Sequence, residues 1–440
     1  MKEEKKQNKA LVLVLGILLA LAVAAGLYFG IRALAKSSSE PEATQPANLT
    51  TTAEATASET GSATEESKAP VEETPEMKAA KTKPVYTDES ITTDDARLDQ
   101  TVVTCGDYTL NNRDVQIFYT MQYYSFLNEY GMFASMMGID SSKPLWEQSS
   151  MSGDLNWEQY FLMASMEDFQ QFAAMATKAA AEGYVLPAAD KEQKESVLSG
   201  LRESYAGYGY DSADAFVQSN FGPSVRFEDY ARYLELYFYA MSYENGLYQD
   251  MSVTEEELEE YYNNHPDEFA GIGRDQTDVN VRHILIALNT DADAPAAVAE
   301  EAREAAKTKA EELLASFQEN PSEEAFAELA KGNSEDPGSK DNGGLYEEVY
   351  PGQMVQPFND WCFDASRQPG DTGIVETSYG FHVMYFVSKS DSYYWKTKAE
   401  QSVKTNRMYA LVDSVMANYP VTPDYANIVL CPLPKQNVTG

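Results

Sequence analysis

A run of residues without a charged side chain lies near the start of the chain, from Ala10 to Ile31. As a helix rising about 1.5 Å per residue, it would extend roughly 33 Å, which is enough to cross the hydrocarbon core of a bilayer. The residues that precede it are rich in lysine, with Lys2, Lys5, Lys6 and Lys9. Because a lysine-rich flank stays in the cytoplasm, we predict a cytoplasmic tail over residues 1–9, a transmembrane anchor over 10–32 and an extracytoplasmic location for the rest.

A cleaved signal peptide is the alternative interpretation of this run, with Ala33-Leu34-Ala35 as the small-residue cleavage site. The run is long for the apolar part of a signal peptide, and Arg32 directly precedes that site. We therefore favour an uncleaved, single-pass anchor in the cell membrane, and leave cleavage open.

Residues 33–95 have the composition of a linker, dominated by Ser, Thr, Ala, Glu and Pro. The large apolar residues between positions 36 and 84 are Leu49, Val71 and Met77. Such a stretch cannot bury enough apolar surface to offset the entropy lost on ordering. We predict a disordered tether that holds the folded part away from the bilayer, with order beginning near Leu98.

The charge balance restricts the partners of the chain. It has 33 basic and 70 acidic residues, a formal charge of -37. Nucleic-acid binding depends on clustered Lys and Arg, and the sequence has no such cluster, so nucleic acid is excluded as a partner. We expect repulsion from anionic lipid surfaces and attraction to basic or unfolded cationic polypeptides.

The three cysteines, Cys105, Cys362 and Cys431, are widely spaced, which argues against a zinc site or a disulfide-rich scaffold. Cys362 lies in an apolar pattern and is interpreted as a core residue, whereas a Cys105–Cys431 disulfide is left open. No acid or cysteine stands at metal-ligand spacing from the three histidines. We predict neither a metal nor another cofactor.

The first folded region is predicted over residues 96–272 and is mostly helical. Residues 102–105 and 108–110 are expected to form strands about a Gly106-Asp107 turn. Apolar residues at helical spacing predict helices after residue 112, around 162–175, over 191–205, 212–220 and 227–247, and after 254. The many Tyr, Phe and Met residues are helix core in one interpretation, and a concave, adaptable surface for unfolded segments in the other.

Residues 279–387 show strand and helix patterns in the order β-α-α-α-β-β. The first strand, with Val281 and Ile284, is followed by an Ala-rich helix and a short helix after Pro321-Ser322. A Gly/Asp/Asn-rich loop over 332–344, a third helix and two closing strands at 373–375 and 381–387 complete the pattern. We predict an α+β fold in which helices cover a small antiparallel sheet.

His283 and His382 each lie among apolar residues on a predicted strand. Their rings are expected to be buried and neutral, with a pKa below that of an exposed histidine. A hydrogen-bonded core histidine without a functional role is the alternative for each. His265, in Asn264-His265-Pro266, is interpreted as a solvated loop residue.

Five segments of this region follow the order and spacing of one known family: Arg282-His283-Ile284-Leu285-Ile286, Asn333-Ser334-Glu335-Asp336, Gly343-Gly344, Pro351-Gly352-Gln353-Met354-Val355-Gln356-Pro357-Phe358 and Thr377-Ser378-Tyr379-Gly380-Phe381-His382. They resemble the parvulin peptidyl-prolyl isomerases, over about a quarter of the chain. Segments 102–110 and 253–269 are similar to parts of the SurA and PrsA chaperone domains, in which the helical domain is built from both sides of the isomerase. Together with the predicted anchor, the chain resembles the PrsA foldases of Gram-positive envelopes.

The resemblance implies a site. It places the catalytic set at His283, Asp336, Thr377 and His382, and the substrate-binding set at Tyr346, Gln353, Met354, Phe358 and Tyr379. Met354 and Phe358, four residues apart at the expected start of a helix, would line the proline pocket; plain core packing is the alternative. Isomerisation breaks no bond, so the histidines are expected to orient the site rather than to transfer protons.

Asp336 is expected to act through its charge, because a carboxylate near the substrate carbonyl disfavours the planar, polarised amide. A turn-forming aspartate before Pro337-Gly338 is the alternative. Leu345, Glu347 and Tyr379 depart from the family pattern, which leaves room for a degenerate domain. The loop over 289–295 has no Lys or Arg, so recognition of phosphorylated Ser-Pro or Thr-Pro is not predicted.

A last helix is predicted over 395–419, ended by Pro420. We expect residues 391–440 to pack on the first folded region, which makes the isomerase domain at 275–390 an insertion. The chain is thus predicted to be an extracytoplasmic foldase that isomerises X-Pro bonds in exported proteins and binds their unfolded segments. A non-catalytic membrane-anchored chaperone is the alternative, and a surface adhesin that uses the module as a spacer is a third. The predicted partners are unfolded or partly folded exported proteins and the membrane, with a homodimer left open.

Overall fold

The computed structural model describes residues 78–79, 82–151, 153–288 and 296–434. They fall into two compact units: unit 1 comprises the chain up to Asp250 and again from Met408, and unit 2 comprises Met251–Arg407. The predicted anchor and most of the predicted linker lie outside the described residues. Within the described ranges, no helix is both long enough and apolar enough to cross a membrane.

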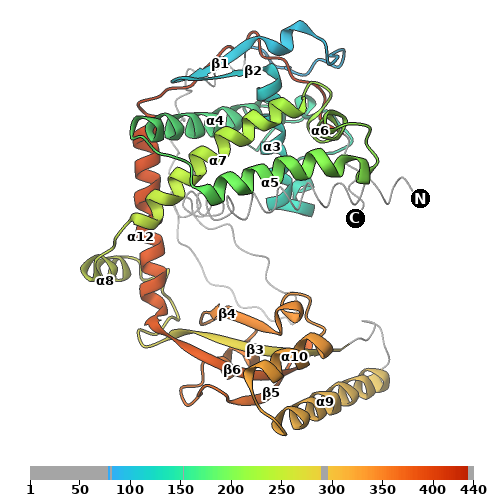
Figure 1. Cartoon of the computed structure of the whole chain (residues 1–440), viewed down its shortest axis with the longest axis vertical. Helices are drawn as coiled ribbons and strands as arrows, with labels where there is room; N and C mark the ends of the chain where they lie inside the picture. Colours follow the sequence, from blue (N-terminus) through green and yellow to red (C-terminus); the bar gives the residue numbers. More distant parts are fainter. Residues whose placement is uncertain (1–77, 80–81, 152, 289–295, 435–440) are drawn as a thin grey trace, which may run out of the picture. The chain divides into compact units, whose positions relative to one another are not determined.

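Unit 1 combines helices with a small sheet (Figure 1). The sheet has the antiparallel strand order β2-β1-β7, and its strands are β1 (Thr101–Cys105), β2 (Tyr108–Asn111) and β7 (Thr422–Pro423). The helices are α3 (Asn112–Tyr130), α4 (Trp157–Ala181), α5 (Ala188–Ser204), α6 (Ala213–Phe221) and α7 (Phe227–Asp250). The helical positions predicted from apolar spacing are therefore helical.

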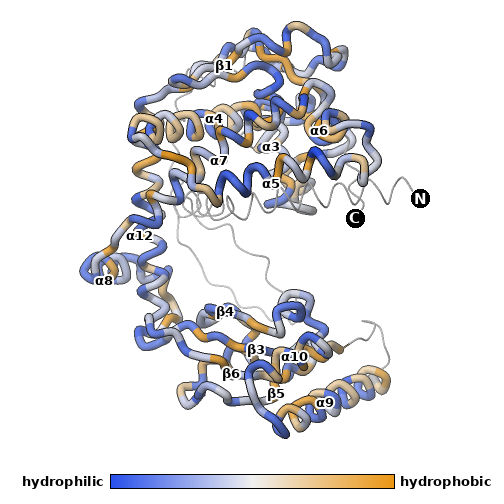
Figure 2. The backbone as a smooth tube through the Cα atoms, viewed as in Figure 1, coloured by the Kyte–Doolittle hydropathy of each residue, from blue (hydrophilic) through white to orange (hydrophobic). Residues whose placement is uncertain are grey.

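Aromatic side chains form the contacts among α3, α4 and α7. Phe118 on α3 lies with its ring centroid 5.7 Å from that of Phe169 on α4 and 5.1 Å from that of Tyr233 on α7, in edge-to-face geometry. Figure 2 shows apolar residues recurring along α4 and α7, whereas α5 has long hydrophilic stretches. The helix core interpretation therefore describes these three positions.

Buried polar side chains of α3 bind the C-terminal segment. Asn112 Oδ1 accepts a hydrogen bond from Val429 N at 2.9 Å, and Gln116 Oε1 accepts one from Cys431 N at 3.0 Å. Both side chains are fully buried. They accept hydrogen bonds from backbone amides that burial would otherwise leave unpaired. Side chains of α3 thus bind the backbone of this C-terminal segment, as the backbone of a neighbouring strand does in a sheet.

The predicted linker ends earlier than residue 95, and order begins before Leu98. Tyr86 is 1% exposed and Ile91 is buried. Asp88 N donates to Leu430 O at 2.9 Å, and Leu430 N donates to Tyr86 O at 3.0 Å. The Glu158 carboxylate on α4 accepts hydrogen bonds from the backbone amides of residues 86 and 87. Local composition could not reveal this order, because the partners are distant in sequence.

Unit 2 contains a sheet of order β4-β3-β6-β5, antiparallel throughout. Its strands are β3 (Thr277–Ala287), β4 (Leu345–Val349), β5 (Thr372–Thr377) and β6 (Gly380–Tyr393). Its helices are α8 (Glu255–Asn264), α9 (Ala296–Gln318), α10 (Glu323–Asn333) and α11 (Gln356–Cys362). The predicted order lacked β4, an edge strand whose single buried residue is Val349, so it carries little apolar pattern.

The two faces of this sheet pack against different helices, because side chains alternate along a strand. Ile284 and Ile286 of β3 belong to a core with residues of α9 and α10. Val279 and Val281 of the same strand belong to a second core with Phe358 of α11. The sheet is thus covered on both faces, as the α+β prediction requires.

The helix α12 (Tyr394–Met416) belongs to unit 2 as far as Arg407 and to unit 1 from Met408. Its first turns pack within unit 2, where Trp395 and Ala399 form a buried cluster with Leu258 and Phe269. The helix α8, which the sequence placed in the first folded region, therefore lies in unit 2. Unit 1 resumes only beyond Arg407, later than the predicted boundary at 391.

Candidate active site

Strand alternation places both histidines on the sheet face that packs against α11. In β3, His283 continues the alternation of the residues in that core, and in β6 His382 does the same. His283 pairs with Met384 and Leu285 pairs with His382, so the two imidazoles are diagonal neighbours. Their Nδ1 atoms are 3.0 Å apart, and the rings are nearly parallel.

A line of hydrogen bonds runs through both rings. Thr377 Oγ1 lies 2.8 Å from His382 Nε2, and His283 Nε2 lies 3.0 Å from Asp336 Oδ2. The Tyr379 amide donates to Thr377 Oγ1, which leaves that hydroxyl free to donate its own proton to His382 Nε2. His382 Nδ1 then donates to His283 Nδ1, and His283 Nε2 donates to the carboxylate. This assignment satisfies every group in the line with both imidazoles neutral.

Asp336 ends this line, with its side chain 15% exposed. Its carboxylate also accepts hydrogen bonds from the Ser339 hydroxyl, from the Tyr346 hydroxyl at 3.0 Å and from the Gly338 amide at 3.3 Å. The hydrogen bond from His283 holds the pKa of Asp336 well below its usual range, and Ser339 lowers it further. The site therefore presents an ionised carboxylate at neutral pH.

His382 is uncharged at neutral pH. Burial lowers the pKa of His382 to about 4, and the neighbouring His283 acts in the same direction. The prediction of a buried, neutral ring with a lowered pKa is confirmed for His382. A neutral ring can donate at one nitrogen and accept at the other, as its two partners here require.

Ser339 was not predicted, although it joins the network. It is almost fully buried, its hydroxyl contacts Asp336, and the same oxygen lies 3.1 Å from His283 Nε2. The available signal was its position three residues after an aspartate in an Asp-Pro-Gly turn, where the local chain reversal brings the two side chains together.

The Gly343-Gly344 pair allows the loop that carries Asp336 to approach β3. Gly344 has φ +74°, and a Cβ atom there would lie 2.2 Å from His283 O. At Gly343, a Cβ atom would lie 2.7 Å from Ala327 Cβ. Residues with a side chain cannot occupy these positions without moving backbone, so the glycines help to fix the distance between the carboxylate and His283.

Phe358 forms the apolar side of the site. Its ring centroid lies 5.4 Å from each imidazole, nearly perpendicular to both. Phe358 is only 3% exposed, whereas Met354 is half-buried against the same core. Met354 precedes α11, so the argument that both residues lie on one helical turn is wrong, although both contact one cluster.

The other predicted substrate-binding residues differ in placement. Tyr346 is half-buried with its ring 5.3 Å from His283. Gln353 is exposed, and its Oε1 accepts from Tyr350 N at 3.0 Å. Tyr379 is 62% exposed in the turn between β5 and β6, so its backbone joins the network while its ring stays outside.

The sequence analysis also considered a metal site, a disulfide and the third histidine. In the described ranges, no three His, Cys, Asp or Glu side chains are placed to hold a metal ion. The three cysteines are buried and unpaired, so the Cys105–Cys431 disulfide is not formed. His265, predicted to be a solvated loop residue, is half-buried, stacks on Tyr261 at 3.9 Å and follows the last turn of α8.

Comparison with known proteins gives one family match, to the PPIC-type PPIase domain, over residues 269–390. The foldase protein PrsA of Geobacillus sp. (strain WCH70) is 31% identical over 32% of this chain and 40% of its own length. The foldase protein PrsA 1 of Listeria monocytogenes serotype 4b (strain F2365) is 28% identical over 34% of this chain and 41% of its own length. The matched part spans about two fifths of these curated relatives.

Among solved structures, the crystal structure of PrsA from Bacillus subtilis is 18% identical and covers 61% of this chain and 89% of its own, with a TM-score of 0.29. The family match coincides with the domain that holds the histidine network. Residues 269–390 are therefore a parvulin (PPIC-type) peptidyl-prolyl isomerase domain, in a chain whose relatives include PrsA foldases.

Proposed function

We propose that this chain is an extracytoplasmic foldase, which isomerises X-Pro bonds in exported proteins and binds their unfolded segments. The observation that carries the proposal is the hydrogen-bonded line from Thr377 to Asp336, beside Phe358 and inside the matched domain. The curated relatives are named foldases, which supports the same function here.

Prolyl isomerisation requires no covalent step from the protein. Rotation about an X-Pro bond has a barrier near 20 kcal/mol, and no bond is made or broken. The site must bind the twisted amide more tightly than either planar form. Twisting removes amide resonance and so reduces the negative charge on the carbonyl oxygen, which makes a fixed carboxylate nearby less repulsive to the twisted state than to the planar one.

The residues divide between contact and positioning. Asp336, Met354 and Phe358 are proposed to touch the substrate: Asp336 beside the carbonyl, and the other two around the pyrrolidine ring. His283, His382 and Thr377 are proposed as positioning residues, because their hydrogen bonds go to one another and to Asp336. Gln353 and Tyr379 remain predicted contacts at the rim, and the exposed Tyr379 ring suits a residue flanking the proline.

The location and organisation of the chain are also proposals. The apolar run over 10–32 would anchor it with the N-terminus in the cytoplasm, and the linker would hold the folded units outside. The isomerase domain would be inserted into a chaperone domain formed by segments on both sides of it. Residues 408–434, which belong to unit 1, support this arrangement. A homodimer stays a prediction.

A proline-isomerisation assay on the full chain in neutral lipid nanodiscs tests the activity, with unphosphorylated peptides as substrate. Asp336→Ala should lower kcat/KM by about 10- to 100-fold, because it removes the charge that discriminates between planar and twisted amide. Asp341→Ala, in the same loop but exposed and without a hydrogen bond to the network, is the matched control and should retain the wild-type value.

A non-catalytic chaperone with a degenerate isomerase domain is the second candidate. The burial of Phe358 favours it, since a sealed ring offers little surface to a proline. In that case wild-type chain and the Asp336→Ala variant would accelerate isomerisation equally little, and the foldase proposal would fail.

A further inference from the structure

The carboxylate at the end of the histidine line belongs to a loop, so its position depends on how that loop is held. Asp336 lies between α10 and β4. The Gly343-Gly344 pair brings the far end of the loop close to β3. The near end, at Ser334 and Glu335, contacts the same strand through hydrogen bonds of its own.

One edge of β3 continues beyond the start of β4. Gly344, directly before β4, accepts a hydrogen bond from His283 N at 2.8 Å through its carbonyl oxygen. Backbone amides of an antiparallel strand face one edge at every second residue, so the next two amides on this edge belong to Leu285 and Ala287. In a regular sheet, the backbone of a longer β4 would supply their acceptors.

Ser334 and Glu335 take the place of a longer β4. Ser334 Oγ accepts from Leu285 N at 3.2 Å, and Glu335 Oε2 accepts from Ala287 N at 2.7 Å. The Glu335 amide in turn donates to Leu285 O at 2.9 Å. Two side chains and one backbone amide of the loop therefore continue the hydrogen-bond ladder of the sheet.

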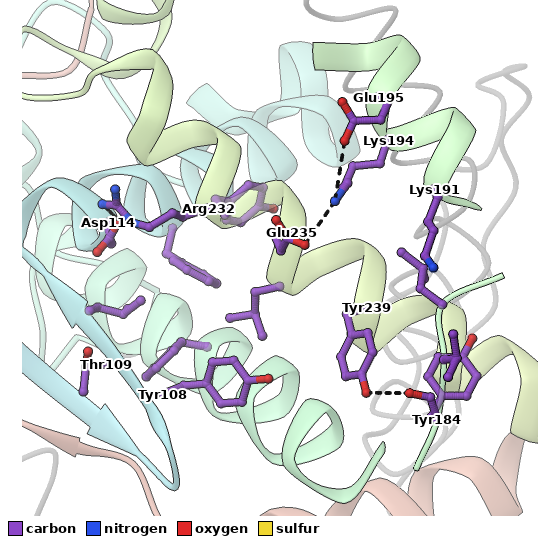
Figure 3. Close-up of a pocket in the computed structure, with 17 residues that line it drawn as sticks. Tyr108, Thr109, Asp114, Tyr184, Lys191, Lys194, Glu195, Arg232, Glu235 and Tyr239 are labelled. Carbon is purple, nitrogen blue, oxygen red and sulfur yellow. Dashed lines mark hydrogen bonds and ion pairs between the residues drawn. The ribbon is translucent and has the colours of Figure 1, made fainter. Parts of the chain in front are cut away.

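This partner of the Glu335 carboxylate differs in kind from those of exposed acids on the helices of unit 1. There, Lys194 Nζ lies 3.8 Å from Glu195 Oε1 and 3.1 Å from Glu235 Oε1 (Figure 3). Such an ion pair depends on the charge of both partners. A hydrogen bond from a backbone amide needs only an acceptor oxygen, which a neutral side-chain amide also provides.

The contacts of Glu335 restrict the residue that follows it. Glu335 is held at two points, by its backbone amide and by its side chain, and the Asp336 amide donates to Ser334 Oγ at 3.3 Å. Asp336 Oδ2 lies 3.0 Å from His283 Nε2. A shift of the loop by about 1 Å would lengthen this distance beyond that of a hydrogen bond.

We propose that Glu335 is a positioning residue of the isomerase, whose side-chain oxygen ties the Asp336 loop to β3 and so fixes the carboxylate beside the substrate. Glu335 acts as a hydrogen-bond acceptor and not through its charge, and its effect on the reaction passes through Asp336. The inference rests on the proposed role of Asp336. It adds a residue outside the histidine line to the groups that hold that carboxylate in place.

The kinetic test compares Glu335→Ala with Glu335→Gln in the full chain in neutral lipid nanodiscs. Glu335 is exposed, so neither substitution disturbs the core. Glu335→Ala should lower kcat about three- to tenfold, as expected for one hydrogen bond, with little change in KM. Glu335→Gln keeps an acceptor oxygen and should retain the wild-type kcat. Glu312→Ala, which removes the same charge from an exposed position of α9, is the control and should retain it as well.

A second measurement follows the network without reference to activity. The chain has three histidines, so ¹⁵N-labelled histidine gives an NMR spectrum with few signals. The proton on His283 Nε2 exchanges slowly with water while its hydrogen bond to Asp336 persists. Glu335→Ala should speed this exchange, and Glu335→Gln should not. The backbone amide of His382, labelled in the same sample, should be unaffected by either, which separates loosening of the loop from a general loss of stability.

An equal fall of kcat in Glu335→Ala and Glu335→Gln would assign the effect to charge and overturn the proposal. So would an unchanged kcat in both, or a rise in KM at constant kcat, which would make Glu335 a substrate contact. Asp336→Ala is measured in the same assay. Wild-type activity of that variant refutes the proposed role of Asp336, whereas a loss of activity in Asp336→Ala without one in Glu335→Ala refutes only the role of Glu335.

Discussion

Units 1 and 2 use buried polar groups for different ends. In unit 1 the side chains of Asn112, Gln116 and Glu158 bind backbone amides of distant segments and hold the unit together. In unit 2 the buried imidazoles of His283 and His382 bind each other and lead to a partly exposed carboxylate. In unit 1 the buried side chains give hydrogen-bond partners to backbone amides that would otherwise be buried without one. In unit 2 the buried imidazoles fix the position of one carboxylate that a ligand can reach.

The largest effect should come from the glycine that separates the Asp336 loop from β3. Gly344→Ala puts a Cβ atom 2.2 Å from His283 O in a left-handed backbone, which should destabilise unit 2 by more than about 3 kcal/mol. Hydrogen exchange of β3 amides measures it. Gly352→Ala also has positive φ but meets nothing within 4 Å, so it should cost about 1–2 kcal/mol. Equal costs would mean that close approach is unimportant.

In unit 1 the corresponding test removes the carboxylate that holds the start of the ordered chain. Glu158→Ala leaves the amides of Tyr86 and Thr87 without their acceptor and should destabilise unit 1 by about 2–3 kcal/mol. Limited proteolysis should then cleave within residues 82–95. Glu192→Ala on the exposed face of α5 is the control, and resistance of both variants to cleavage would contradict the role of Glu158.

The sequence indicated the features of unit 2 that the first prediction tests, but not the contacts of unit 1 that the second tests. The apolar residues around His283 and His382 predicted buried histidines on strands, whereas the resemblance to the parvulin family implied the Asp336 loop and the glycine pair. The early start of order near Tyr86 did not, since its partners Leu430 and Glu158 lie far along the chain. The strand β4 was missed because an exposed edge strand has little apolar alternation. The sequence left open whether the aromatic residues of unit 1 form helix core or a concave surface, because both arrangements have the same helical spacing.

Unit 2 also contains a buried carboxylate that, unlike Asp336, has an oxygen without a hydrogen-bond partner among the described residues. Asp278 is 8% exposed, and its Oδ1 has no hydrogen-bond partner among the described residues. Burial raises the pKa of Asp278 to about 6, and Glu348 adds to the shift. Above pH 6 the folded state holds an uncompensated charge, so Asp278→Asn should stabilise unit 2 by about 2 kcal/mol at pH 7. Asp391→Asn, at an exposed position of β6, should change little.

Asp278 and His382 should contribute to the pH dependence of stability with opposite signs between pH 6 and 4. The raised pKa of Asp278 lets the folded state take up a proton there, which increases stability as pH falls. The lowered pKa of His382 lets the unfolded state take up a proton first, which decreases stability as pH falls from about 6.5 to 4. Each contributes at most about 1.4 kcal/mol per pH unit, so they nearly cancel in the wild type.

The Asp278→Asn substitution removes the contribution of Asp278 and leaves that of His382. Unit 2 of this variant should therefore lose stability as the pH falls. Hydrogen exchange of β3 amides at pH 6.5, 5.5 and 4.5 measures the slope. Combining the substitution with His382→Gln should flatten it. A slope that persists in the double variant would assign the acid sensitivity to other groups.

The smallest effect concerns the hydroxyl of Tyr346, which donates to Asp336. Tyr346→Phe removes one hydrogen bond to Asp336, and should cost about 1 kcal/mol of stability. Tyr385→Phe, a half-buried tyrosine of the same sheet whose hydroxyl has no hydrogen bond within the described part of the chain, should cost less. The informative measurement is kinetic. If Asp336 acts on the twisted amide by its charge, loss of the phenol leaves the charge in place but less fixed, so kcat should fall about two- to fivefold while KM changes little. A rise in KM at constant kcat would instead make Tyr346 a wall of the substrate pocket, and would move it from the polar network of unit 2 to its apolar side.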